Sequence, residues 1–145
     1  MTAPAELSWE ALAVTTPLPE FVDEPLTRTD FVRYQGASGD LNPIHHDEQY
    51  ARAAGFPGVF TVGMLPAGIL GTYLADLFGP ESIRRFRVQF REQSWPGDVL
   101  TYRGVVVGRE ERDGERLVTL ELEVVRQTGG VHAKGWATVA CGGAA

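Results

Sequence analysis

The longest helical pattern of hydrophobic positions in this chain lies at residues 65–78. Apolar side chains occupy nearly every side of that helix, Pro66 falls in its first turn, and Gly79 follows its last residue, as is typical of helix boundaries. A helix that is apolar all round is expected to be buried. Gly68 and Gly71 each lower its helix propensity by about 1 kcal/mol relative to alanine, which predicts that strands approach the helix closely there.

After this helix the period of the hydrophobic positions becomes two. Phe86, Val88 and Phe90 alternate with polar residues, which predicts a strand with one face in the core. Further strands are predicted at residues 100–107, 116–126 and 131–140, with hairpin turns at Asp113-Gly114 and Gly129-Gly130. A buried helix followed by antiparallel hairpins predicts an α+β fold in which the helix packs on the sheet.

The part of the chain before the long helix has weaker patterns. Residues 1–18 are expected to be loosely ordered. Thr27 and Asp30 have the spacing of a capping box, and Asp47 is placed to cap a later helix. The elements expected in this part are short strands near residues 12–14 and 20–22 and helices at about 27–36 and 48–54.

Composition narrows the class of protein. The chain has 145 residues and is expected to form one domain, residues 1–145, which buries about two-thirds of its unfolded surface. The net charge of −6 argues against nucleic acid as a partner. No apolar run is long enough to predict a membrane span, and the one cysteine, Cys141, cannot form an internal disulfide. We expect a cytoplasmic protein.

The run Ser38-Gly39-Asp40-Leu41-Asn42-Pro43-Ile44-His45 is the strongest chemical signal. Pro43 interrupts any continuous helix, so a stiff turn can direct the Asp40 carboxylate and the His45 imidazole at a common point. A carboxylate beside an imidazole is suited to proton transfer near neutral pH. For an isolated pair, a turn held by hydrogen bonds with a structural histidine is the simpler interpretation.

This run resembles the motif of the MaoC-like hydratases, the (R)-specific enoyl-thioester hydratase/dehydratase family. The motif has an acid, a spacer, Asn-Pro, an aliphatic residue and His, which here are Asp40 to His45. Further stretches resemble the family in the same order: Leu26-Thr27 through Gly36, Gly63-Met64-Leu65 and Pro96-Gly97-Asp98. Together they cover about residues 20–140, and among relatives the chain is most similar to short actinobacterial (3R)-hydroxyacyl-thioester dehydratase subunits.

The resemblance implies a hot-dog fold, in which a curved antiparallel sheet wraps around a long central helix. It also implies reversible addition of water to a trans-2-enoyl thioester, which gives the (R)-3-hydroxyacyl thioester, without a metal or other cofactor. By the same resemblance, the substrate is expected to be carried on coenzyme A or on an acyl-carrier protein. Subunits of the family pair edge to edge, so a homodimer, or a heterodimer with another hot-dog subunit, is expected.

The family's functional residues carry over to matching positions of this chain. Asp40 is expected to activate the water, and His45 to hold the same water and deliver a proton. Asn42 is expected to lock the turn rather than to touch the substrate. The backbone N–H of Gly63, at the start of the long helix, is expected to bind the thioester oxygen. Val62 stands where relatives commonly carry His, which bears on the polarity of the pocket.

Other residues have open interpretations. Phe56, Phe60, Met64 and Ile69 either line an acyl channel or pack in the core. Arg85, Arg87 and Arg91 form either a solvated strand face or a site for the phosphates of coenzyme A or an acidic carrier protein. His46 is expected to be exposed, and nothing suggests a catalytic role for His132 or Cys141. The spacing of His45, His46 and Asp47 does not favour a metal site.

Two other functions remain open at this point. The hot-dog fold also carries thioesterases, and fold alone does not separate the two chemistries. A non-catalytic subunit of a heteromeric dehydratase is a third possibility. Such subunits tend to lack the acid or the histidine, whereas this chain has both Asp40 and His45, so we expect it to be the active member of any pair. Acyl length, carrier and direction of reaction are left open by the sequence.

Overall fold

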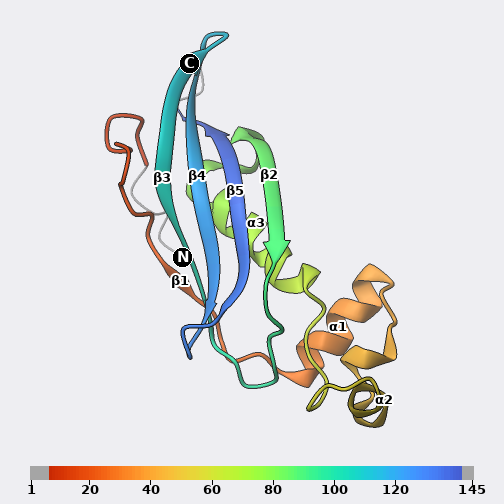
Figure 1. Ribbon diagram of the computed structural model, residues 1–145. Helices are drawn as coiled ribbons and strands as arrows, with labels where there is room; N and C mark the ends of the chain where they lie inside the picture. Colours follow the sequence, from red (N-terminus) through yellow and green to blue (C-terminus); the bar gives the residue numbers. More distant parts are fainter. Residues whose placement is uncertain (1–6, 142–145) are drawn as a thin grey trace.

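The computed structural model describes residues 7–141 and has an α+β architecture (Figure 1). In chain order its elements are β1 (Phe21–Val22), α1 (Arg28–Ser38), a 3-10 helix (Pro43–His45), α2 (Glu48–Ala53), α3 (Met64–Phe78), a 3-10 helix (Pro80–Ser82), β2 (Ile83–Phe90), β3 (Leu100–Arg112), β4 (Glu115–Arg126) and β5 (Val131–Ala140). No helix within residues 7–141 has both the length and the apolar character that crossing a membrane requires.

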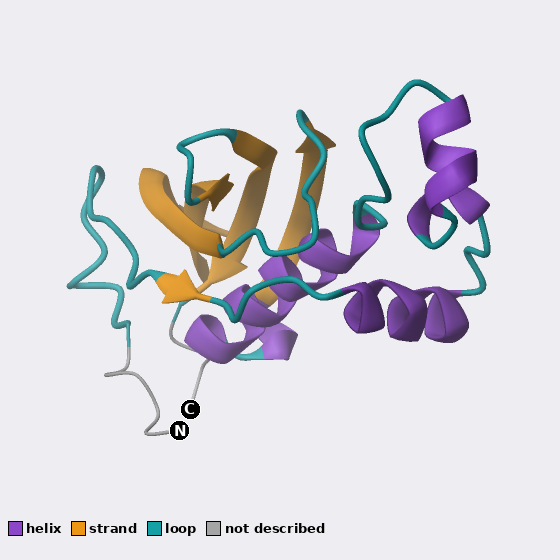
Figure 2. Cartoon of the chain, turned by 90° about the horizontal axis from the view of Figure 1, so that it is seen from below, coloured by secondary structure: helices purple, strands orange, loops and turns teal. Residues whose placement is uncertain are grey.

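The five strands form one antiparallel sheet in the order β1-β3-β4-β5-β2. The long strands β3, β4 and β5 curve around α3, which lies against the concave face of the sheet (Figures 1 and 2). This is the expected curved sheet around a long central helix. The helices α1 and α2 lie at one end of the sheet, next to the N-terminal end of α3 (Figure 1).

The core fills the space between α3 and the sheet. Leu70 and Leu74 of α3 are fully buried together with residues of β4 such as Leu120 and Leu122. The helix approaches β5 closely at Gly135, where an added Cβ would lie 3.0 Å from the Leu70 side chain. A side chain at this position would therefore push α3 away from the sheet.

One side of α3 is exposed, which corrects the expectation of a helix buried all round. Met64, Gly68, Thr72 and Asp76 follow one another at intervals of four residues and form this exposed side. An added Cβ at Gly68 would meet no atom within 4 Å, so the expected close approach of a strand does not occur at Gly68. The structure gives no physical reason for glycine at this position.

The strand β2 differs from its prediction in burial. Its position in the chain and its alternation are as expected, but Phe86 and Phe90 are 39% and 48% exposed rather than in the core. The reason is the strand order, because β2 lies at the edge of the sheet and pairs only with β5. Hydrophobic alternation identifies the face of a strand but not whether a neighbour covers it.

Residues 7–20, which precede β1, pack on the core without a helix or an extended strand. The strand expected near residues 12–14 is wrong, since residues 12–13 are irregular and a turn begins at residue 14. Leu12 and Leu18 are nevertheless buried, and Pro17 forms an isolated bridge with Val105. The expectation of a loosely ordered start covered residues 1–18, of which residues 1–6 lie outside the described part of the chain.

Candidate active site

The candidate catalytic turn is held in place at the end of α1. The helix begins with the expected capping box, in which the Thr27 side chain accepts from the Asp30 N–H and the Asp30 carboxylate accepts from the Thr27 N–H. The helix runs two residues beyond the expected Gly36 and ends before Gly39, whose φ of 77° lies in the left-handed region. Such a φ suits glycine, and it redirects the chain directly before Asp40.

Local hydrogen bonds then fix the shape of the turn. Asp40 Oδ1 accepts a hydrogen bond from Asn42 N at 3.3 Å, and Asn42 Oδ1 accepts one from Ile44 N at 3.1 Å. The second bond caps the short 3-10 helix that begins with Pro43. Asn42 therefore bonds the backbone of the turn, as expected for a residue that locks it.

His45 is held in one orientation. It is 8% exposed, its ring packs edge-on against Phe60 at 5.2 Å between ring centroids, and its Nδ1 lies 2.7 Å from the carbonyl oxygen of Phe60. A carbonyl only accepts hydrogen bonds, so the proton of the ring is on Nδ1. In the neutral ring, Nε2 is then the nitrogen with a free lone pair.

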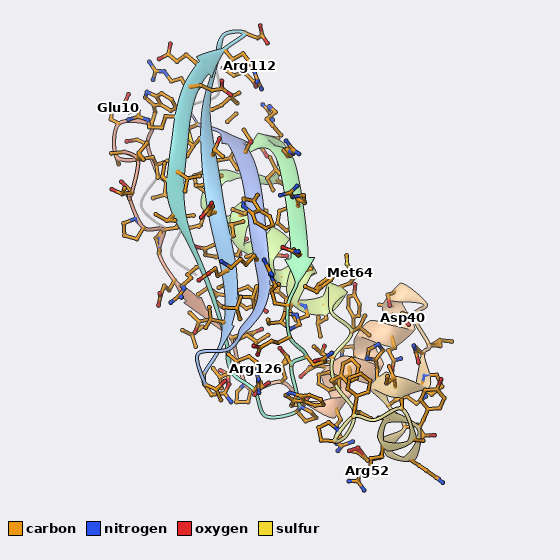
Figure 3. All side chains as sticks on the ribbon, in the orientation of Figure 1. Glu10, Asp40, Arg52, Met64, Arg112 and Arg126 are labelled. Atoms are coloured by element: carbon orange, nitrogen blue, oxygen red, sulfur yellow. The ribbon has the colours of Figure 1, made fainter. Side chains whose placement is uncertain are left out.

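Asp40 and His45 line the same cavity, which has a volume of about 470 Å³. Gly63 and Met64, at the start of α3, and Phe90, at the end of β2, also line it. Figure 3 shows Asp40 and Met64 at the end of the molecule where α1 lies near the start of α3. Asn42 is not among the lining residues. The structure thus brings together three of the four predicted site residues, from segments on both sides of the cavity.

The start of α3 offers a free hydrogen-bond donor to this cavity. Among the described residues, no atom accepts a hydrogen bond from the Gly63 N–H. Unpaired N–H groups and the helix dipole favour negative charge at this end of a helix. An added Cβ on Gly63 would lie 3.0 Å from the Phe90 ring, so a side chain at this position would displace that ring. The neighbouring Val62 is buried and contributes an apolar wall.

The structure assigns the residues whose roles the sequence left open either to the cavity or to other parts of the fold. Phe60 and Met64 line the cavity, whereas Phe56 packs against Phe60 and Ile69 packs on the core. Of the three arginines, Arg91 lines the cavity.

The other two arginines of this group lie elsewhere. Arg87 stacks on Trp136 with its guanidinium 4.5 Å from the ring centroid, and Arg85 is exposed. His46 is exposed as expected. Among residues 7–141, no group of three or more His, Cys, Asp or Glu is placed to hold a metal ion.

Sequence reasoning missed His132, which also lines the cavity. His132 is 2% exposed, and its Nδ1 lies 2.8 Å from Ser94 Oγ. Its Nε2 is buried without a hydrogen-bond partner among the described residues. Burial lowers the pKa of His132, so the ring is neutral near pH 7. No sequence signal identified it, because β5 brings this residue to the cavity only in the folded protein.

Comparison with known proteins establishes the class of protein that this fold and cavity represent. The MaoC like domain model matches residues 13–128, and the chain belongs to this family. Structural similarity confirms the hot-dog fold. The structure of R-hydratase PhaJ1 from Pseudomonas aeruginosa superimposes with a TM-score of 0.81 at 23% identity, covering 95% of this chain and 88% of that one.

Three other similar proteins illustrate the relationship. The ChsH1-ChsH2 complex from Mycobacterium tuberculosis contains a chain with a TM-score of 0.76 and 24% identity, and the match covers 90% of this chain and 98% of that one. The peroxisomal hydratase-dehydrogenase-epimerase of Saccharomyces cerevisiae is 34% identical over 83 residues, or 57% of this chain. Enoyl-CoA hydratase ChsH3 of Mycobacterium tuberculosis is 33% identical over 85 residues, or 55% of this chain. The matches span only 9% and 27% of these two relatives.

Proposed function

We propose that the hot-dog domain expected for residues 1–145 catalyses the reversible hydration of trans-2-enoyl thioesters to (R)-3-hydroxyacyl thioesters. The observation that carries this proposal is the convergence of Asp40, His45 and the free Gly63 N–H on one cavity. Membership of the MaoC-like family supports it, as do the hydratase names of the relatives.

The proposed reaction needs only proton transfer and charge stabilisation. A water molecule is held between the Asp40 carboxylate and Nε2 of His45, and Asp40 takes a proton as the water oxygen bonds to C3. Electrons of the 2,3 double bond move toward the thioester, where the Gly63 N–H binds the oxygen on which negative charge develops. The proton that Asp40 took from water passes to Nε2 of His45 and from there to C2, so both residues end in their starting protonation states.

The tautomer of His45 supports this division of roles. Because Nδ1 donates to the Phe60 carbonyl, Nε2 accepts a hydrogen bond from water when the ring is neutral and donates when it is protonated. The exposed Asp40 carboxylate is the second acceptor for the same water. Arg91, which lines the cavity, is the proposed contact for an anionic part of the thioester carrier.

The first test is the loss of enone absorbance when the purified protein meets crotonyl-CoA and a medium-chain trans-2-enoyl-CoA, followed by chiral analysis of the product. We expect the (R)-3-hydroxyacyl product. Asp40→Asn should keep the fold and lower kcat by about 10²–10⁴-fold, and His45→Ala should lose activity. Asp76→Asn is the matched control, because Asp76 is exposed on α3 and does not line this cavity.

The outcomes separate the alternatives. Full activity of Asp40→Asn would remove this residue from the mechanism. Release of free thiol without hydration would identify a thioesterase instead. Inactivity of the protein alone, with activity restored by a second hot-dog subunit, would identify it as one subunit of a heteromeric dehydratase.

We further propose that β2 pairs with β2 of a second hot-dog subunit, either a copy of this chain or a related one. The outer edge of β2 has no strand partner among the described residues, and Phe86 and Phe90 are exposed beside it. Natural proteins seldom leave such an edge uncovered. Phe90 also lines the cavity, so a partner at this edge would cover the cavity's exposed side. The similarity to a chain of the ChsH1-ChsH2 complex supports a pair of hot-dog subunits.

Sedimentation analysis tests this pairing. The purified protein is expected to have twice its monomer mass of 15.8 kDa, and Phe86→Glu is expected to shift it toward monomer because it places charge at the buried centre of the interface. Arg85→Glu on the opposite, exposed face of β2 is the control. A fully active monomer would contradict the proposal.

A further inference from the structure

The site contains a buried polar side chain to which the proposed chemistry assigns no role. Gln35, on α1, is 2% exposed although neighbouring positions of the helix face solvent. A buried amide is costly unless its hydrogen bonds are satisfied. The position of Gln35 therefore raises the question of which groups it binds.

Gln35 contacts the catalytic turn at two backbone positions. Its Nε2 donates to the carbonyl oxygen of Asp40 at 2.9 Å and to that of Asn42 at 3.0 Å. These carbonyls flank Leu41, so the amide clamps the backbone between the two proposed catalytic residues. Both hydrogens of the amide are used, and the reversed amide would set its oxygen against two carbonyl oxygens, which fixes its orientation.

The other end of the amide engages a histidine. Gln35 Oε1 lies 2.9 Å from Nδ1 of His46, and because the amide oxygen only accepts, His46 must donate from Nδ1. His46 follows His45 directly, so the clamp also holds the end of the turn. One buried side chain thus binds the turn at residues 40, 42 and 46.

Local bonds alone do not provide this connection. The side-chain bonds of Asp40 and Asn42 are internal to the turn, whereas the Asp40 N–H donates to the Ser38 hydroxyl at the end of α1 at 3.2 Å. Asp40 itself is exposed. Without the Gln35 amide the turn keeps its internal bonds and the bond from Asp40 N to Ser38 Oγ, but it loses the three side-chain bonds that tie residues 40, 42 and 46 to α1. A displacement of about 1 Å in a catalytic group can lower the rate by about 10²-fold.

We infer that Gln35 is a positioning residue, which places Asp40 and His45 by clamping the backbone between them and fixing the tautomer of His46. The inference rests on the proposed hydratase function. It assigns Gln35 no contact with substrate, since Gln35 does not line the cavity.

Two substitutions separate the parts of this clamp. Gln35→Met has similar length and makes none of the three bonds. Gln35→Glu keeps an acceptor for His46 but, when ionised, cannot donate to the two carbonyls. We expect kcat to fall about 10- to 100-fold in both, with KM within about threefold of wild type. As the pH falls, the carboxyl group introduced by Gln35→Glu becomes protonated and can again donate a hydrogen bond to a carbonyl of the turn. The kcat of Gln35→Glu relative to wild type should therefore rise, whereas that of Gln35→Met should not.

Phe31→Leu is the matched control for loss of stability. Phe31 is a fully buried residue of the same helix, so its truncation lowers Tm without touching the turn. It should leave kcat unchanged. Two results would overturn the positioning role. One is that Phe31→Leu, at equal Tm, lowers kcat as much as the Gln35 variants do. The other is that both Gln35 variants keep kcat within about twofold of wild type.

A second measurement is independent of activity. Nitrogen-15 NMR of the histidine rings should show neutral His46 protonated on Nδ1 in the wild type and in Gln35→Glu, and on Nε2, the usual form in water, in Gln35→Met. An Nε2-protonated His46 in the wild type would overturn the clamp. Absence of hydratase activity in wild type with the expected His46 signal would refute the proposed function while leaving the clamp geometry intact.

Discussion

The loop that follows β2 depends on one buried carboxylate, and its removal gives a quantitative test of the structure. Asp98 is 4% exposed. It accepts hydrogen bonds from Arg126 Nε at 2.7 Å and Nη2 at 3.2 Å, from Gln127 Nε2 at 2.9 Å and from Trp95 N at 2.8 Å. This carboxylate therefore joins the loop at residues 94–98 to the end of β4.

Asp98→Ala should be strongly destabilising because it leaves these donors without an acceptor. Breaking a buried ion pair costs about 3–5 kcal/mol. Arg126 retains a second carboxylate, Glu92 at 3.7 Å, so we expect the lower end, about 3 kcal/mol. With an unfolding entropy of about 2.1 cal/mol/K per residue for 145 residues, Tm should fall by about 10 °C.

Thermal and urea unfolding measure this loss, with exposed Asp76→Ala as the control. Burial alone would raise the pKa of Asp98, but the bonds from Arg126, Trp95 and Gln127 outweigh it and hold the pKa below its usual value. The stabilisation is therefore present above about pH 4 and is lost as the pH falls through the lowered pKa. A loss below about 1 kcal/mol near pH 7, or a loss that is unchanged at low pH, would refute the assigned network.

Three other substitutions test separate features. Tyr102→Phe should raise Tm by about 3 °C, because the Tyr102 hydroxyl is buried without a partner among the described residues. Gly39→Ala should cost about 1–2 kcal/mol in chemical unfolding and lower kcat, since φ is 77° beside Asp40, whereas Gly36→Ala should do neither. Between about pH 6.5 and 5, the Tm of the wild type should fall by more than the Tm of His132→Gln. Burial lowers the pKa of His132 in the folded protein, so protonation in this interval favours the unfolded state.

The sequence predicted those features that depend on neighbouring residues. The capping box of α1, the Asp47 cap of α2 and the bounds of α3 were predicted within one or two residues, because local hydrogen bonds and hydrophobic period determine them. Burial was predicted less well. The exposed Phe86 and Phe90 depend on the place of β2 at the sheet edge, which its own residues do not specify.

The candidate site likewise has features that neighbouring residues determine and features that depend on the folded arrangement. Asp40, Asn42 and His45 lie in one short run, and the shape of their turn follows from bonds within that run. The contacts that hold this turn against the rest of the site come from outside the run: Gln35 clamps it from α1, five and seven residues before the carbonyls that it binds, and the carbonyl of Phe60, 15 residues after His45, orients the imidazole.

The Phe60 segment is itself tied to the far side of the cavity. Thr61 N donates to the Ser94 carbonyl, and the Ser94 hydroxyl bonds His132 of β5. The tautomer of His45 therefore depends on a segment that β5 and the Asp98 loop support. Loosening of that loop in Asp98→Ala should lower kcat as well as Tm. Asp40→Asn, which lies on the other side of the cavity, should lower kcat alone, and comparing the two variants separates loss of support from loss of chemistry.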